Sequence, residues 1–242
     1  MVNFWRVVNS VIKEADAIVE VVDARTVENT RNIEIEDKIK KVGKKLIVAI
    51  NKCDMISKKE SEAIQKRVPN SIFISSVERL GTRKLREKIL RSSNKKEIKV
   101  GVLGYPNTGK SSLINALKGR AVARVSAQSG HTRGLQLIRI SKRLTLIDTP
   151  GVFPYKEKDE GKHAMTSARS THDIKDLELA VLELIESLNG KIEKHYRVKK
   201  HKDTEETLEA IAIKLKKLKK RGVPNTKLAA RTIIQDWQAG KI

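Results

Sequence analysis

Residues 104–111 read Gly-Tyr-Pro-Asn-Thr-Gly-Lys-Ser, which is the spacing of a loop that wraps around phosphate groups. Its glycines permit tight turns, so that successive backbone N–H groups can point inward at an anion. Lys110 is expected to contact the β- and γ-phosphates, and the hydroxyl of Ser111 to bind Mg²⁺. The residues predicted to contact a nucleotide in this motif are Asn107, Thr108, Gly109, Lys110, Ser111 and Ser112. For this motif taken by itself, a chance glycine-rich turn is the alternative.

A second motif, Asp-Thr-Pro-Gly at 148–151, supplies groups that complement a phosphate loop. It follows the apolar run 144–147, so Asp148 is predicted at the carboxyl end of a buried strand. A carboxylate there can hold Mg²⁺ through water, and the Gly151 N–H can meet the γ-phosphate. By itself the motif could be a turn that ends a strand; its place after a phosphate loop favours the nucleotide role.

The third motif, Asn-Lys-Cys-Asp at 51–54, is suited to recognising a base. It directly follows the apolar run 46–50, which predicts a buried strand. The carboxylate of Asp54 can accept both the N1–H and the N2–H₂ of guanine, a pair of donors that adenine lacks. Because an unmatched buried carboxylate is costly, Asp54 is predicted to select guanine. An isolated tetrapeptide of this kind would be a solvated turn.

Four more residues complete the predicted base site. Asn51 is expected to bridge the base edge and the phosphate loop, and the stem of Lys52 to pack along the nucleotide. A further strand over 71–74 leads to Ser75 and Ser76, whose backbone N–H groups could support the base. Serine pairs also commonly close strands, so this last assignment has a plain structural alternative.

The order of the three motifs along the chain is informative. In ordinary small GTPases the phosphate loop comes first and the base motif near the end, whereas here the base motif leads. The chain therefore resembles a circularly permuted GTPase of the ribosome biogenesis GTPase A (YlqF/YawG) family. The resemblance covers most of the chain and includes Asp23-Ala24-Arg25, Thr30-Arg31-Asn32 and a closing segment from Leu228 to Lys241.

The resemblance and the length of 242 residues imply an α/β fold in two parts. A circularly permuted P-loop GTPase domain, with a mostly parallel sheet between helices, is expected over 1–160. A small all-α domain, basic and RNA-binding, is expected over 161–242. Other permuted GTPases carry a zinc module, but Cys53 is the one cysteine of this chain and cannot make a cysteine-rich zinc site.

The catalytic residues are only partly evident. The resemblance implies that Thr132 is the switch I ligand of Mg²⁺, so catalytic roles are assigned to Lys110, Thr132 and Gly151. Ras-like enzymes place a water-orienting glutamine after the 148–151 motif, but here the residue is Val152, whose apolar side chain cannot orient water. In bacterial members this role is assigned to a histidine close to the N-terminus. This chain has no histidine before His131, which adjoins Thr132 and is the candidate substitute, with a solvated loop histidine as the alternative.

Asn107 suggests a second cation. In related potassium-dependent GTPases an asparagine at this position of the phosphate loop coordinates K⁺, whose charge can replace an arginine finger. The prediction is therefore a slow intrinsic GTPase that is stimulated by K⁺ and by the large ribosomal subunit.

The charge of the chain favours a polyanionic partner. There are 51 basic and 29 acidic residues, a net charge of +22, and no Asp or Glu lies between Ile98 and Ile147. An excess of this size favours a polyanion. The resemblance implies that the partners, besides GTP and GDP, are ribosomal RNA and the large ribosomal subunit. A lysine-rich thermophilic surface is the alternative, but it would balance its charges. Since aromatic residues make up only 3 % of the chain, we expect recognition of phosphate and shape rather than of bases.

Beyond about residue 170 the pattern becomes helical, with apolar side chains at three- and four-residue steps. One helix is predicted to start at the cap Asp203 and to stop before Gly222 and Pro224. Its apolar stripe is Leu208, Ile211, Leu215 and Leu218. A last helix is predicted over 226–237 with a buried set of Leu228, Ala230, Ile233, Ile234 and Trp237.

The remaining features bound the hypotheses. No apolar run is long enough to span a membrane, the N-terminus lacks the pattern of a signal peptide, and a single cysteine suits a reducing compartment. We therefore expect a cytoplasmic monomer that does not bind a membrane. The leading hypothesis is a GTPase switch on ribosomal RNA. The alternative is an RNA scaffold that binds guanine nucleotide with negligible hydrolysis; Asp54 disfavours an ATP-dependent RNA enzyme.

Overall fold

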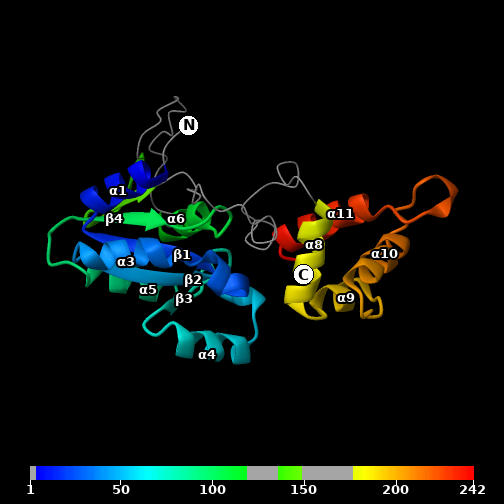
Figure 1. Cartoon of the computed structure of the whole chain (residues 1–242). Helices are drawn as coiled ribbons and strands as arrows, with labels where there is room; N and C mark the ends of the chain where they lie inside the picture. Colours follow the sequence, from blue (N-terminus) through cyan, green and yellow to red (C-terminus); the bar gives the residue numbers. More distant parts are fainter. Residues whose placement is uncertain (1–3, 119–135, 149–176) are drawn as a thin grey trace. The chain divides into compact units, whose positions relative to one another are not determined.

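The apolar runs that precede the three motifs are all strands of one sheet (Figure 1). The structure, a computed structural model, describes residues 4–118, 136–148 and 177–242. Within them the sheet has the strand order β3-β2-β1-β4-β6-β5, in which β5 is antiparallel to β6 and the other neighbours are parallel. The strands are β1 (Ala17–Asp23), β2 (Lys45–Asn51), β3 (Ile72–Phe73), β4 (Ile98–Leu103), β5 (Gln136–Ser141) and β6 (Leu144–Asp148).

The register brings the polar motifs to one edge of the sheet. Asp23 at the end of β1 pairs with Asn51 at the end of β2, and Asp148 at the end of β6 pairs with Val102 of β4. Since the carboxyl ends of parallel strands meet at one edge, the residues that follow these strands lie close together there. Every residue of β1 is buried, as expected for a central strand covered on both faces.

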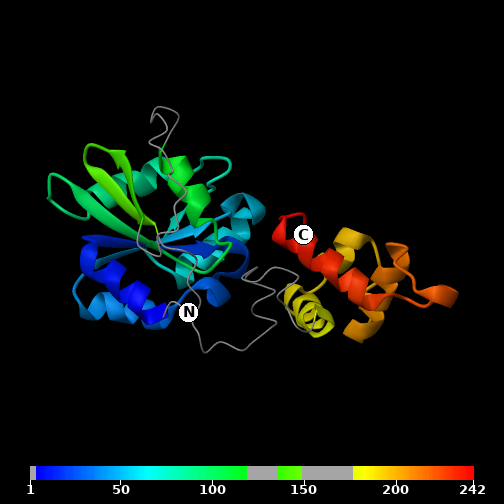
Figure 2. The same ribbon diagram turned by 90° about the horizontal axis from the view of Figure 1, so that it is seen from above.

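Helices cover both faces of the sheet (Figure 2). On one face α1 (Phe4–Glu14) and α3 (Ile33–Lys41) pack through Val8, Val11, Ile12, Ile35 and Ile39. On the other face α5 (Thr82–Leu90) and α6 (Lys110–Lys118) pack through Leu85, Ile89, Leu113, Ile114 and Leu117. A separate cluster joins Ile64 of α4 (Lys58–Arg67) to Val22 and Ile50. The short helices η1 (Ala24–Thr26), α2 (Val27–Thr30) and η2 (Cys53–Met55) lie at the edge where the strands end.

The chain divides into two units, Met1–Lys156 and Glu157–Ile242, and the described part of the second is helical. Its described helices are α8 (Leu177–Leu188), α9 (Lys191–Tyr196), α10 (Thr204–Lys214), η3 (Lys220–Gly222) and α11 (Thr226–Gln238). They share a core of their own, built around Leu184, Ile211, Ile233 and Trp237. The boundary that we predict between residues 160 and 161 lies outside the described residues.

α10 is shorter than its sequence pattern predicts. It begins as expected at Asp203, whose side chain caps the first turn, but it ends at Lys214 instead of continuing toward Gly222. Lys216 adopts a left-handed φ of +55°, and the N–H groups of Lys216 and Lys217 close onto carbonyls of the last helical turn. Leu218, predicted to continue the apolar stripe, is therefore exposed and pairs with Pro224 in an isolated bridge.

One residue of the predicted buried set in the last helix is wrong. Leu228 of α11 is 40 % exposed, and Ala229 is fully buried in its place. The other four members of that set are buried as predicted. The cap explains the helix start, because the side chain of Asn225 accepts a hydrogen bond from the N–H of Leu228. Among the helices of the described residues, none is long and apolar enough to cross a bilayer.

Candidate nucleotide-binding site

The phosphate loop lies between β4 and α6 and is folded around the side chain of Lys110. The Lys110 ammonium donates hydrogen bonds to the carbonyls of Gly104 at 2.9 Å and Tyr105 at 2.6 Å. The hydroxyl of Thr108 donates to the same Tyr105 carbonyl at 2.9 Å. The loop thus has the shape that a phosphate group requires, with the positive end of α6 behind it.

Burial weakens the charge of Lys110. Desolvation lowers the pKa of this ammonium to about 8, although the nearby carboxylate of Asp148 acts in the opposite direction. A bound phosphate would add a negative charge beside the ammonium and so favour its charged form. Lys110 is therefore a group whose protonation can be linked to nucleotide binding.

Asn51 joins the base motif to the phosphate loop. Its side-chain N–H₂ donates to the carbonyl of Thr108 at 2.8 Å, across 57 residues of sequence. Its side-chain oxygen accepts two hydrogen bonds from Ser76, one from the backbone N–H at 3.1 Å and one from the hydroxyl at 2.9 Å. Asn51 is only 2 % exposed, so these three bonds satisfy a buried amide and fix the loop relative to the end of β2.

Ser75 and Ser76 support the site in a different way from the one predicted. The N–H of Ser75 donates to the carbonyl of Leu80, and that of Ser76 donates to Asn51. Both N–H groups that we expected to face the base are thus bonded within the protein. Ser76 thereby fixes the position of Asn51.

Gly109 is required by the contact between the two motifs. Its φ of +93° is a conformation that side-chain-bearing residues rarely adopt. A Cβ atom at this position would lie 2.2 Å from the side-chain nitrogen of Asn51. The glycine therefore serves the approach of the phosphate loop to the base motif as well as the tight turn itself.

Lys52 is held by a carboxylate that precedes it in the sheet. Its ammonium donates to Asp23 at 2.7 Å, and Asp23 is also bound by the Arg25 guanidinium at 2.9 Å. Burial acts to raise the pKa of Asp23, but the hydrogen bonds and charges of Arg25 and Lys52 outweigh burial and hold it below its usual value. The Asp-Ala-Arg signature thus positions the base motif. The signature itself is evident in the sequence, but its ion pair with Lys52 is not.

The Thr-Arg-Asn signature is a second support behind the site. The hydroxyl of Thr30 accepts a hydrogen bond from the N–H of Asp23 at 3.0 Å. The N–H of Asn32 donates to the buried side chain of Glu20 at 2.8 Å, while burial raises the pKa of Glu20 to about 8. These bonds secure the segment that follows β1, and with it the carboxylate that holds Lys52.

The residues predicted to bind the base and the metal are open to a ligand. Asp54 in η2 is exposed, as is Ser111 in the first turn of α6. Asp148 is half-buried at the end of β6, beside β4. A hydroxyl and a carboxylate are hard oxygen ligands, so these residues fit Mg²⁺ together with phosphate oxygens and water. Among the described residues no cluster of three acidic, histidine or cysteine side chains could hold a metal by itself.

Three residues with predicted catalytic roles, His131, Thr132 and Gly151, lie outside the described residues, as does Val152. The structure therefore brings together the base motif, the phosphate loop and Asp148. Their roles toward a nucleotide stay predictions.

Fold and site together define a class: a circularly permuted P-loop GTPase, in which the strand of the base motif precedes the strand of the phosphate loop. The family model described as "50S ribosome-binding GTPase" matches residues 99–221. The chain belongs to this family, and its motif order is circularly permuted.

Two curated relatives match along 98 % of this chain. An uncharacterized GTP-binding protein of Methanocaldococcus jannaschii is 38 % identical, and the nucleolar GTP-binding protein 2 of Saccharomyces cerevisiae is 32 % identical. The chain spans 65 % of the archaeal protein and 52 % of the yeast protein. Among solved structures, GNP-bound YlqF from Thermotoga maritima has a TM-score of 0.67 and 23 % identity, covering 98 % of this chain and 94 % of that one. This likeness confirms the predicted fold.

Proposed function

We propose that this protein is a GTP-hydrolysing assembly factor of the large ribosomal subunit that binds ribosomal RNA in a nucleotide-dependent way. The observation that carries the guanine-nucleotide part is the hydrogen bond from Asn51 to the Thr108 carbonyl. It sets the base motif beside the phosphate loop, so that one ligand with a base and phosphates can engage both.

Mg²⁺ is the cofactor that this site would take. Ser111 and Asp148 would hold it, with Thr132 as the third ligand that the resemblance implies. Its charge would neutralise the phosphate oxygens when bound. We also propose that K⁺ binds at Asn107, which has a left-handed φ of +59° at the exposed bend of the phosphate loop.

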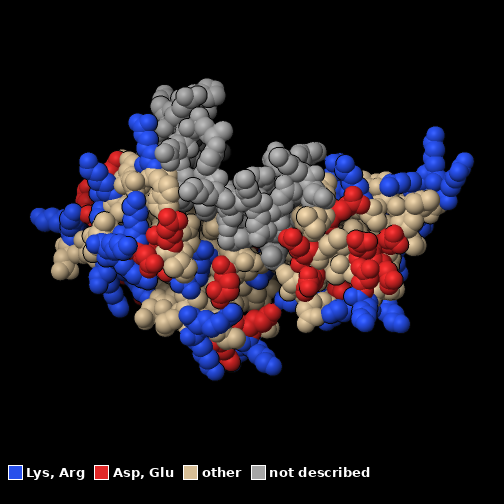
Figure 3. Space-filling model, viewed as in Figure 1, with Lys and Arg blue, Asp and Glu red and all other residues tan. Residues whose placement is uncertain are grey.

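The RNA part of the proposal is supported by a basic hairpin, residues 214–224, between α10 and α11. Figure 3 shows Lys and Arg side chains projecting from the connection between these helices. The backbone is ordered by hydrogen bonds from the Lys219 N–H to the Val223 carbonyl at 2.7 Å and from the Asn225 N–H to the Lys217 carbonyl at 2.8 Å. No acidic residue lies between Glu209 and Asp236. An ordered, unopposed row of cations is suited to an RNA backbone.

The names of the relatives support the ribosomal assignment. The matching family is described by binding to the 50S subunit, and the yeast relative is a nucleolar GTP-binding protein. The extension of these descriptions to this chain is part of the proposal, since the chain spans about half of the yeast protein.

Single-turnover hydrolysis of GTP tests the proposed activity. We expect slow hydrolysis by the purified protein in KCl, slower hydrolysis in NaCl, and faster hydrolysis when large ribosomal subunits are added. Equal rates in KCl and NaCl would exclude K⁺ at Asn107. No hydrolysis under any of these conditions would favour the alternative, a guanine-nucleotide-binding RNA scaffold.

A further inference from the structure

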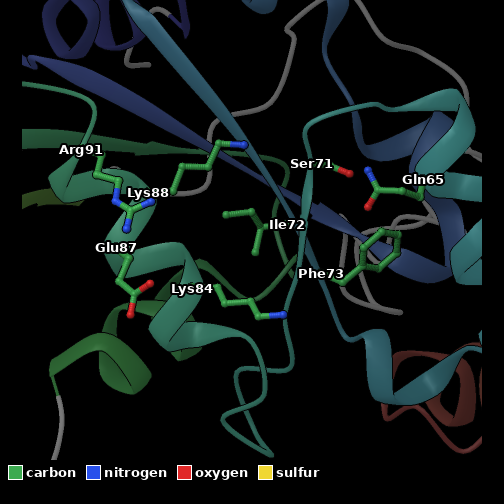
Figure 4. Close-up of a pocket in the computed structure, with 8 residues that line it drawn as sticks. All are labelled: Gln65, Ser71, Ile72, Phe73, Lys84, Glu87, Lys88 and Arg91. Atoms are coloured by element: carbon green, nitrogen blue, oxygen red, sulfur yellow. The ribbon is translucent and has the colours of Figure 1, made fainter.

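A groove lies at the free edge of the sheet, away from the phosphate loop. It has a volume of about 610 Å³ and runs between β3, α5 and the end of α4 (Figure 4). We call it the β3–α5 groove. Its lining residues are Gln65, Ser71, Ile72, Phe73, Lys84, Glu87, Lys88 and Arg91. Since β3 is the outermost strand on this side, the groove is not closed by another strand.

One wall of the groove is a row of cations on a single face of α5. Lys84, Lys88 and Arg91 follow one another at four- and three-residue steps, so their side chains share a helix face over about 10 Å. Lys88 donates to the carbonyl of Asn70 at 2.5 Å, which holds it beside the loop before β3. Among the described residues neither Lys84 nor Arg91 has an ion-pair partner, and the acid of this wall, Glu87, lies 3.5 Å from Arg83.

The side of the groove opposite α5 is the edge strand β3. Its residues Ile72 and Phe73 are each half-buried, and Figure 4 shows Ile72 directed toward α5 and Phe73 directed toward the side of Gln65. The apolar side chain of Ile72 beside a row of cations complements a single-stranded nucleic acid, whose bases can make apolar contacts while its phosphates bind cations. A duplex would offer chiefly its phosphates to such a surface.

The charge around the groove favours a repeating polyanion. From Arg83 to Lys99 the chain carries eight Lys and Arg residues and two Glu residues. The groove is thus one part of a longer basic surface that a single compact anion would not neutralise. An RNA strand presents a negative charge at every nucleotide and can follow such a surface.

We propose that the β3–α5 groove binds a single strand of RNA through its phosphates, as a contact of the GTPase unit that is distinct from the basic hairpin. This inference rests on the proposed function in so far as RNA is the partner. It adds a second RNA contact, which lies on the first unit but on a surface apart from the nucleotide motifs.

The experiment measures binding of a fluorescent, unstructured oligouridylate to the full chain by anisotropy over a range of KCl concentrations. The test variant is Lys84→Gln with Arg91→Gln, which removes two groove cations and leaves the backbone contact of Lys88 intact. The matched control is Lys58→Gln with Lys59→Gln, which removes the same charge from the exposed first turn of α4, outside the groove. Equal melting temperatures of the three proteins would verify that folding is unaffected.

The test variant should bind roughly tenfold more weakly, and its salt dependence on a log–log plot should fall by about 1.4, or 0.7 for each lost contact. The control should retain the affinity and slope of the wild type. If the wild type binds RNA and both variants bind equally well, the groove is not the site, although the proposed RNA function survives. If the wild type does not bind oligouridylate, the groove proposal fails, whereas the proposed function is contradicted only if the protein also fails to bind large ribosomal subunits. Displacement of the RNA by an oligoglutamate of equal charge would assign the groove to acidic proteins instead.

Discussion

At the scale of residues, the contact between Asn51 and the phosphate loop depends on the absence of a side chain at Gly109. Replacement of Gly109 by Ala would place a methyl group 2.2 Å from the Asn51 amide in a backbone conformation that alanine rarely adopts. We expect the affinity for GDP to fall roughly 30-fold or more, because backbone strain and the loss of a hydrogen bond should weaken binding by about 2 kcal/mol or more. Isothermal titration calorimetry measures this loss.

Gly43→Ala is the matched control for this change. Gly43 also has a positive φ, +69°, but nothing lies within 4 Å of the Cβ that alanine would add. We expect it to cost about 1 kcal/mol of stability while leaving the affinity for GDP unchanged. Equal loss of affinity in both variants would show that backbone strain alone, rather than the Asn51 contact, explains the effect.

Lys110 should couple nucleotide binding to proton uptake. Its pKa is near 8 in the free protein, and a bound phosphate raises it, so binding of GDP at pH 8 should take up about half a proton and binding at pH 9 about nine tenths of a proton. Calorimetry in buffers of different ionisation enthalpy measures this uptake. Lys110→Arg, which stays charged, is the control and should show no uptake. Binding enthalpies that are the same in every buffer at pH 8 would contradict the assignment.

Asp54 can be tested by changing the base. Asp54→Asn exchanges an acceptor for a donor, so binding should shift from GDP toward xanthosine diphosphate, by roughly 100-fold or more in the ratio of the two affinities. Competition against a fluorescent nucleotide measures the ratio. An unchanged preference for GDP would refute Asp54 as the guanine selector.

The sequence predicted part of this site for reasons that are local. The bridge by Asn51 could be expected because its motif must contact both a base and the phosphate loop, and the structure has that contact. The ion pair of Lys52 with Asp23 could not, because it joins residues 29 positions apart whose proximity depends on the pairing of β1 with β2. The partner of the Ser76 N–H could not be foreseen for the same reason, since Asn51 belongs to β2, whereas the Ser75 N–H closes a local turn onto Leu80.

At the scale of elements, the strands that lead into the motifs were predictable and the end of α10 was not. β2, β4 and β6 are short apolar runs directly before polar motifs, a pattern that is typical of buried parallel strands. α10 keeps its helical pattern as far as Leu218, but its chain turns at Lys216. A lysine gives no signal for a left-handed conformation, since glycine is the usual residue there.

That turn gives a prediction about stability. Lys216→Gly should stabilise the second unit by about 0.5–1 kcal/mol, because glycine adopts the φ of +55° without strain. Lys214→Gly, two residues earlier at the last position of α10, removes the same charge and should destabilise the unit by about 0.5 kcal/mol. Urea unfolding followed by the fluorescence of the buried Trp237, in a Trp5→Phe background, distinguishes the two. Destabilisation by both changes would contradict the role assigned to the turn.

At the scale of the whole molecule, the permuted order of the motifs places the nucleotide site directly before the second unit in the chain. Asp148 ends the last strand of the sheet, and the next described element is α8 of the second unit. In chain order, the motif at 148–151 therefore leads into the unit that carries the basic hairpin. This order is consistent with a nucleotide-dependent contact with RNA, since a single segment of the chain joins the nucleotide site to the unit that carries the basic hairpin.

The most direct test of the proposed function is sedimentation of the full chain with purified large ribosomal subunits. We expect the protein to pellet with the subunits in the presence of a non-hydrolysable GTP analogue and to remain largely in solution with GDP, an affinity difference of roughly tenfold or more. Gly109→Ala should abolish this difference, whereas Gly43→Ala should preserve it. Equal pelleting of the wild type with GDP, with the analogue and without nucleotide would contradict a GTP-controlled association with the ribosome.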